Sequence, residues 1–286
     1  MNRRERRAAV ASSKENREMT SPDISVAAAF RAYESRRLEE AEVISKQILA
    51  NAPSHRESLM LLGAIYQSTR RHRLAIKQFL MAIALNSFDA ICHYNIACSY
   101  QILGEFKPAR DHFARAIRLG IGVEEFIAHN PIVLNCVRRI REPHTSSIGK
   151  VVIGPNEIIS IANDLFLQCA LRLKLVRSVE LELFLTQLRQ ALLSLVINAP
   201  STITEHVARL SCALAEQCFI NEYVFTQTTE ESQLAEQLRK LLIQKMATDE
   251  KISVPILSVV AAYFPSTSFP RPKSSVRRSG RNGRRI

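Results

Sequence analysis

The stretch that decides the fold reads LMLLGAIY at residues 59–66. Thirty-four residues further on, HYNIACSY at residues 93–100 has a similar arrangement of large and small side chains. Gly63 in the first stretch corresponds to Ala97 in the second, and Tyr66 corresponds to Tyr100. Several matched positions at one fixed interval indicate a repeated structural unit.

Each copy continues into a second set of matched positions, and the interval also reaches back to a weaker first copy. The expected unit is a pair of helices, because small residues on both helices allow a close approach and large residues fill the space between units. Gly104 stands at the turn inside the last unit, and Arg36 and Arg70 hold the equivalent positions. The matched positions are Ala29, Gly63 and Ala97; Ala41, Ala75 and Ala109; Phe79 and Phe113; and Ile48, Ala82 and Ala116.

This pattern closely resembles the tetratricopeptide repeat family over residues 22–123, in units at 22–55, 56–89 and 90–123. The resemblance implies an all-α fold in which three repeats form a helical solenoid. It also implies a concave groove that is lined by the first helix of each unit and holds a protein or peptide ligand. The alternative interpretation is an ordinary amphipathic helical bundle.

Mapping the repeat positions onto this chain selects candidates for partner binding from all three units. Some family members clamp a C-terminal carboxylate with Lys, Asn and Arg at such positions, but apolar residues such as Val26 stand here. A mixture of apolar and amide groups favours a helix or an extended apolar segment as the ligand. A second interpretation stays open, in which the chain's own next helix fills the groove. The candidates are Phe30, Tyr33, Met60, Gln67, Tyr94 and Gln101.

Residues 124–265 leave the 34-residue interval but keep a helical periodicity, which predicts a helical connector domain. Pro200 ends one helix, and Thr202 or Thr204 can cap the next. A linker is expected at residues 143–155, with a short extended run at 150–153. The expected helices cover residues 156–175, 178–198, 203–220, 229–247 and 252–264.

Three further stretches are similar to bacterial proteins in which tetratricopeptide repeats and a helical connector precede an S-adenosylmethionine-dependent methyltransferase domain. They are NRRERRA at residues 2–8, AEQCFINEYVF at residues 215–225 and AAYFP at residues 261–265. The resemblance implies the repeat and connector portion without the catalytic domain. The G-x-G at residues 120–122 follows a helix rather than a strand, and it is interpreted as a helix cap. No cofactor is therefore expected.

The formal net charge is +12, and most of it lies at the two ends of the chain. Residues 1–20 carry six basic and three acidic side chains, and residues 266–286 carry seven basic and no acidic ones, which leaves only +2 for the rest. The segments 1–21 and 266–286 are predicted to be disordered basic tails. Nucleic acid is not expected as a partner of the core, and weak nucleic-acid binding through the tails is an alternative function.

The chemistry-bearing residues do not form a known motif. Six cysteines lack C-x-x-C spacing, and seven histidines lack H-E-x-x-H spacing, so neither a metal site nor a catalytic residue is expected. The cysteines are interpreted as buried reduced thiols, which fits the cytoplasm, and His112 is expected to face solvent. Neither a secretory signal nor a membrane span is predicted.

We therefore expect a bacterial, cytoplasmic protein–protein interaction module without enzymatic activity. By resemblance, it is a non-catalytic remnant or partner of a methyltransferase. The main alternative is a part or regulator of a methyltransferase that acts in trans.

Overall fold

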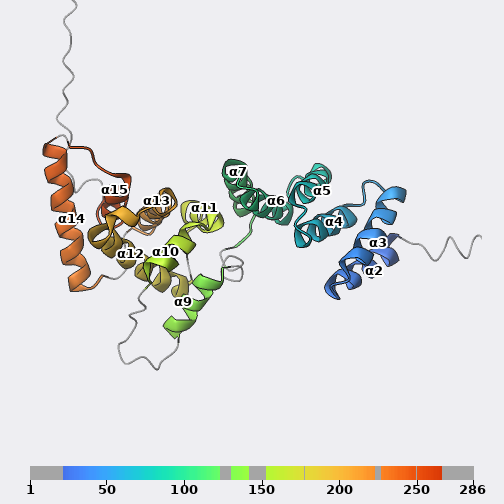
Figure 1. Cartoon of the computed structure of the whole chain (residues 1–286), viewed down its shortest axis with the longest axis horizontal. Coiled ribbons are helices and arrows are strands. Elements are labelled where there is room, and N and C mark those ends of the chain that lie inside the picture. The colour runs from blue at the N-terminus through green and yellow to red at the C-terminus, as the bar shows by residue number, and fades with distance from the viewer. Residues whose placement is uncertain are drawn as a thin grey trace, which may run out of the picture. The chain divides into compact units, whose positions relative to one another are not determined.

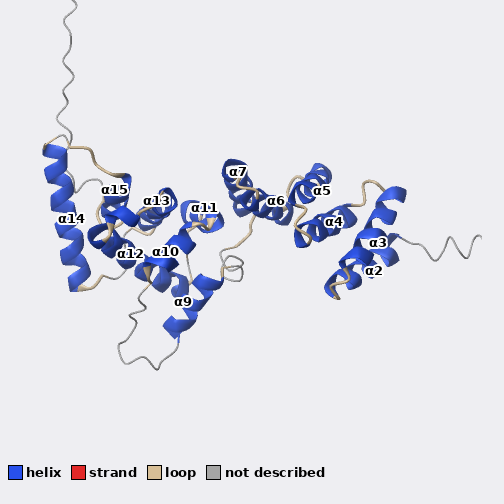
Figure 2. Cartoon of the chain, in the orientation of Figure 1, coloured by secondary structure: helices blue, strands red, loops and turns tan. Residues whose placement is uncertain are grey.

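The computed structural model of the protein describes residues 22–122, 130–141, 153–176, 178–222, 227–248 and 250–265. Within these stretches it contains thirteen α-helices, one short 3-10 helix and no strand, which confirms the predicted all-α class (Figure 2). The predicted tails at 1–21 and 266–286 lie outside the described residues, as does most of the predicted linker with its extended run. The chain divides into two compact units, residues 1–139 with 160–176, and residues 140–159 with 177–286.

Three consecutive helix pairs open the first unit (Figure 1). The first helices begin at residues 22, 56 and 90, and the second helices begin at 38, 72 and 106, so both starts recur every 34 residues. Each helix contacts the next one along the chain, and neighbouring first helices also contact each other. The pairs are α2 (Pro22–Glu34) with α3 (Leu38–Asn51), α4 (Arg56–Ser68) with α5 (His72–Leu85), and α6 (Ala90–Ile102) with α7 (Phe106–Arg118).

Small side chains make the close approach inside these pairs possible. Gly63 on α4 shows the limit, because a Cβ atom added there would lie 2.8 Å from two ring atoms of Phe79 on α5. A real Cβ atom at that distance would force the ring to move. The matched alanines are completely buried at Ala29, Ala41, Ala75, Ala97, Ala109 and Ala116.

The turns inside the three pairs share one backbone conformation. Arg36, Arg70 and Gly104 adopt left-handed φ angles of 61°, 59° and 75°. In each turn the N–H of this residue bonds to the carbonyl three residues back, and the following N–H bonds to the carbonyl five residues back, at 2.7–3.1 Å. This is the Schellman arrangement, in which a left-handed residue ends the helix. Glycine suits the position, whereas a residue with a Cβ atom is strained there by about 1 kcal/mol.

The helices that follow the third pair differ from the sequence prediction. One helix is predicted over residues 156–175, but the structure has two, α10 (Pro155–Ala162) and α11 (Leu165–Leu173). The break falls at Asp164, whose carboxylate caps α11 by accepting a hydrogen bond from the N–H of Leu167 at 2.9 Å. Short Asp side chains compete for backbone hydrogen bonds in this way, and an apolar periodicity does not reveal it. In the first unit, α9 (Pro131–Arg141) comes before this region, and α11 packs against α7.

The second unit is built on α12 (Val179–Asn198), a helix of 20 residues with many buried leucines. The helices predicted at 178–198, 203–220 and 229–247 are confirmed within two residues at each end, and the last helix is shorter than the predicted 252–264. Thr204, rather than Thr202, caps the helix after Pro200. The remaining elements are a 3-10 turn (Pro200–Thr202), α13 (Glu205–Ile220), α14 (Thr229–Ala247) and α15 (Val254–Ala261).

A buried ion pair joins three parts of the second unit. The side chains of Arg189 on α12 and Glu231 on α14 are 1% and 2% exposed, and Arg189 Nη2 lies 3.1 Å from Glu231 Oε1. The hydroxyl of Tyr263, just beyond α15, donates to the same oxygen at 2.6 Å, and the guanidinium lies 4.6 Å from the centre of the Tyr263 ring. Burial and then the Glu231 charge raise the pKa of the Tyr263 hydroxyl, so it stays protonated and can donate. Glu231 Oε2 also accepts the N–H of Thr228 and completes the capping box of α14.

Candidate functional site

The six side chains predicted to bind a partner lie on the first helices of the three pairs, two on each helix. Phe30 is the most exposed of them, with 39% of its surface accessible. The other five are partly buried: Tyr33, Met60, Gln67, Tyr94 and Gln101. The prediction that they bind a partner stays a prediction, and their contacts inside the chain differ from one pair to the next.

Three of these residues occupy one repeat position, and each reaches forward to the next element of the chain. The Tyr33 hydroxyl lies 3.2 Å from Ser68 Oγ on α4. Gln67 Nε2 donates to the Asn95 carbonyl and to Ser99 Oγ on α6, at 2.7 and 2.9 Å. The third member, Gln101, donates its Nε2 to the carbonyl of Asn163, just before α11, at 3.2 Å. These polar groups therefore tie successive helices together within the first unit.

The third pair is covered in part by the chain's own helix α11. The ring of Tyr94 meets the ring of Phe166 edge-on at 5.3 Å between centroids, and Phe166 lies 5.5 Å from Phe113 of α7. The chain's own helix α11 therefore occupies part of the surface beside Tyr94, and the interpretation that the chain's next helix fills the groove stays open. Met60, in contrast, packs against the core cluster of the second pair as a partly buried side chain.

A small cavity of about 210 Å³ remains beside Tyr94, and it contains one thiol, that of Cys98. Burial raises the pKa of this thiol to about 12, so it is protonated at neutral pH and is a poor nucleophile. Burial likewise raises the pKa of Cys92 to about 12 and the pKa values of Cys169 and Cys218 to about 11. All six cysteines are free thiols, and these four are not activated for chemistry.

Sequence reasoning missed a contact between two histidines of the third pair. The Nδ1 atoms of His93 on α6 and His112 on α7 lie 2.9 Å apart. His112 is partly buried between His93 and Tyr100, so the expectation that it faces solvent is wrong. Burial, followed by Arg115 for His93 and by His93 for His112, lowers the pKa of both rings. The helical pairing of α6 with α7 was the available signal, but it does not give the register of the two rings.

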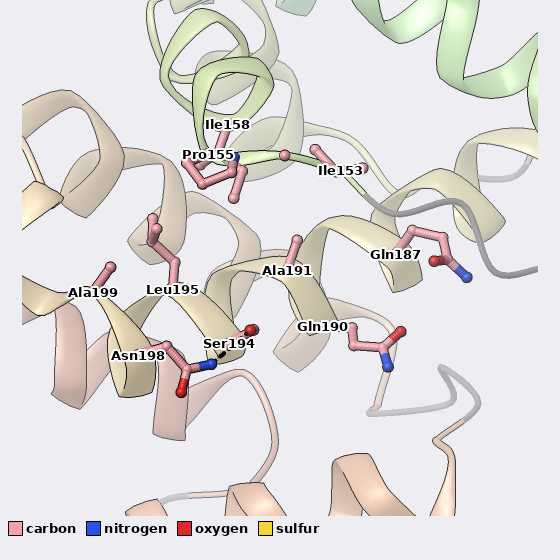
Figure 3. Close-up of a pocket in the computed structure, with 11 residues that line it drawn as sticks. Ile153, Pro155, Ile158, Gln187, Gln190, Ala191, Ser194, Leu195, Asn198 and Ala199 are labelled. Carbon is pink, nitrogen blue, oxygen red and sulfur yellow. Dashed lines mark hydrogen bonds between the residues drawn. The ribbon is translucent and has the colours of Figure 1, made fainter.

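A second hollow lies in the second unit, on a face of α12 that the sequence had not singled out (Figure 3). Its volume is about 310 Å³. Figure 3 shows Ala191 and Leu195 of α12 on one side, and Pro155 and Ile158 of α10 on the other. Amide side chains of α12, such as that of Gln190, also line the hollow. Such side chains do not stand out in a sequence, because surface helices contain many of them, so only the structure brings them to attention.

The residues that the structure describes contain no group of three or more His, Cys, Asp or Glu side chains that could hold a metal ion. None of the helices in the described stretches is both long enough and apolar enough to cross a bilayer. No protein-family model and no curated protein sequence matches this chain.

Proposed function

We propose that the protein is an interaction module of the tetratricopeptide repeat type, which binds a segment of another polypeptide on the first helices of its pairs. One observation carries the proposal: helix starts recur every 34 residues, and the same left-handed turn recurs at residues 36, 70 and 104. Stacked pairs of this kind form the extended surfaces on which solenoid proteins bind their partners.

The contacts inside the chain indicate which part of the surface is open to a partner. Tyr94 and Gln101 already contact Phe166 and Asn163 of the same chain. Phe30, in the first pair, has the largest exposed fraction of the six candidates. We therefore assign the partner mainly to the first two pairs, with Phe30 as the apolar anchor.

The chemistry of this surface favours an apolar or helical segment over a charged terminus. The candidates in the first two pairs are Phe30, Tyr33, Met60 and Gln67, none of which carries a charge at neutral pH. An aromatic anchor with neighbouring amide and hydroxyl groups suits the apolar face of a helix, or an extended apolar peptide.

The proposal is tested by affinity capture with two matched variants of the full chain. Phe30→Asp changes an exposed apolar residue on the proposed surface, and Val43→Asp makes the same change on α3, where Val43 is 55% exposed. We expect a protein that is captured saturably by the wild type and by Val43→Asp but at least tenfold less by Phe30→Asp. Equal capture by the two variants would count against the proposed surface.

The suggested link to a methyltransferase rests on the resemblance of short stretches, one of which, residues 215–225, ends outside the described residues. We propose that any such link is through a separate protein, because no cofactor motif was found in the sequence. Titration calorimetry with S-adenosylmethionine is expected to show no saturable heat. A stoichiometric binding curve would contradict the non-enzymatic assignment.

A further inference from the structure

The hollow on α12 has the size of a small-molecule site. Its volume of about 310 Å³ lies at the lower end of the range for such sites, roughly 300–1,000 Å³. All of its lining residues belong to the second unit. They come from the segment 153–158 and from one face of α12 between residues 187 and 199. The space suits a molecule built on a single ring.

No lining residue carries a charge at neutral pH, although the chain has 39 basic and 27 acidic residues. A charged ligand would lose hydration here without meeting an opposite charge. The N-terminus of α10, which would otherwise attract an anion, is already occupied by Glu157, whose Oε2 accepts the N–H of Gly154 at 3.0 Å. The pocket therefore selects against ions of either sign.

Both sides of the pocket carry apolar side chains that are fixed in place by burial. Ile153, Ile158 and Leu195 are 4%, 1% and 5% exposed. Ala191 and Pro155 complete this apolar lining, and Figure 3 shows them facing each other across the hollow. Flat apolar atoms of a ligand would gain contact area here without any polar group losing its hydrogen bond.

The rim carries hydrogen-bonding groups in a row along α12. Gln190, Ser194 and Asn198 are spaced four residues apart, so they lie on one face of the helix. Asn198 Nδ2 donates to Ser194 Oγ at 3.1 Å, the bond drawn dashed in Figure 3. That bond leaves Asn198 Oδ1 to accept and the Ser194 hydroxyl to donate, and the amide of Gln190 offers one more group of each kind.

We propose that this pocket binds a small, uncharged, planar ligand whose ring lies between the apolar side chains of α10 and α12 and whose carboxamide or lactam edge pairs with the carboxamide of Gln190. A primary or cyclic amide presents a donor and an acceptor side by side, which matches the carboxamide of Gln190. This inference does not depend on the proposed function, because it concerns the second unit alone.

Two pairs of probes with matched shape test the ligand class on the full chain. Benzamide is compared with benzoate, and nicotinamide with nicotinate, by NMR titration of the protein. We expect the two amides to bind saturably with dissociation constants that are roughly millimolar, as befits ligands of so few atoms. The two carboxylates are expected to bind at least tenfold more weakly. Equal binding of amide and carboxylate, or no saturable binding of either amide, would overturn the proposal.

Three variants place the binding in this pocket. Ala191→Phe fills the space and is expected to abolish benzamide binding. Gln190→Leu keeps the side-chain volume but removes the amide, and it is expected to weaken the binding of benzamide at least threefold. Gln233→Leu, the same change at an exposed position of α14, should leave binding unchanged. Thermal unfolding checks that each variant is folded, and Gln190→Leu decides the matter if Ala191→Phe does not fold. Unchanged benzamide affinity in Gln190→Leu would show that the ligand binds elsewhere.

Discussion

The two units of the chain hold their helices together in different ways. In the first unit, modest contacts recur from pair to pair: buried small residues, left-handed turns, and ion pairs between neighbours such as Arg71 with Glu42. In the second unit, one buried pair, Arg189 with Glu231, joins α12 to α14 and holds Tyr263. We infer that stability is distributed in the first unit and concentrated in the second. In a repeat array, the free energy of unfolding is a sum of small contributions from each repeat and from each contact between neighbours. A buried ion pair, in contrast, loses its whole contribution when one partner is removed, because the other charge stays buried and unpaired.

The largest expected effect comes from breaking the concentrated contact. Arg189→Met removes the guanidinium and leaves the carboxylate of Glu231 buried without its counter-charge. We expect the free energy of unfolding of the second unit to fall by about 3–5 kcal/mol. Urea denaturation followed by circular dichroism measures it, because the second unit should unfold at a lower urea concentration than the first.

The matched control removes both charges. Arg189→Met with Glu231→Gln leaves no buried ion, and the amide oxygen can still accept the Tyr263 hydroxyl. This double variant is expected to recover at least half of the loss, since two well-packed neutral groups can replace a buried pair. If the single variant loses less than about 1 kcal/mol, the stability of the second unit is not concentrated at this pair.

In the first unit, the largest single effect is expected at Gly63, where the helices come closest. Gly63→Ala places a Cβ atom 2.8 Å from the Phe79 ring, so the ring must shift. We expect the free energy of unfolding to fall by about 1–3 kcal/mol, which is typical of overpacking. Hydrogen exchange should show the loss mainly in α4 and α5, because each pair contacts only its neighbours.

A shorter side chain at residue 79 allows the packing effect of Gly63→Ala to be measured separately from its effect on helix propensity. In a Phe79→Leu background, Gly63→Ala is expected to be much less harmful, because the ring atoms that it would meet are gone. In an ordinary exposed helix, Gly→Ala stabilises by about 1 kcal/mol. A gain of that size in the wild-type background would disprove the close-packing interpretation.

The same contrast explains how much the sequence could predict. The helix pairs followed from the 34-residue spacing, because matched positions such as Gly63 and Ala97 reveal a period directly. The contact between Tyr94 and Phe166 did not, since a period says nothing about residues 72 positions apart. Arg189 looked like one polar residue in a leucine-rich helix, and only its three-dimensional partner shows that it is buried. Regular local patterns can be predicted from a single sequence, but long-range contacts that occur only once cannot.

A pH-dependent effect is expected in the third pair of the first unit. Burial lowers the pKa of His93 and of His112 in the folded chain. As the pH falls below the ordinary histidine pKa of about 6.5, the unfolded chain therefore takes up protons that the folded chain resists. The contribution of the two neutral rings to the free energy of unfolding is therefore fully present above about pH 6.5. It is lost as the pH falls from there toward the lowered pKa values of the folded chain. Urea midpoints between pH 7.5 and 5 would measure it.

The charged groups around the two rings partly oppose each other. Asp89 favours the protonated form of His93 and Arg115 disfavours it, while Asp111 favours the protonated form of His112. His112→Asn removes one titrating ring and is expected to flatten the pH dependence of the first unit without changing that of the second. An unaltered pH dependence in this variant would assign the acid sensitivity to other groups.

The smallest expected effect is an increase in the free energy of unfolding when a strained turn residue is replaced by glycine. Arg36 and Arg70 hold the left-handed conformation that Gly104 adopts in the third pair. Arg70→Gly relieves the Cβ strain but loosens the unfolded chain, so we expect a net gain of about 0.5 kcal/mol. Gly104→Ala should lose a similar amount. Chemical denaturation of the first unit, measured in replicate, can resolve changes of this size.

Three further variants decide whether the gain in stability comes from the backbone and whether it is distributed over the pairs. Arg70→Ala retains a Cβ atom, so it should not share the gain; if it does, the charge of the arginine rather than the turn was responsible. Arg36→Gly and Arg70→Gly lie in separate pairs, and distant sites add within about 0.3–0.5 kcal/mol. The double variant should therefore gain the sum of the two. A gain no larger than that of one variant would mean that the first unit, like the second, depends on a single weakest contact.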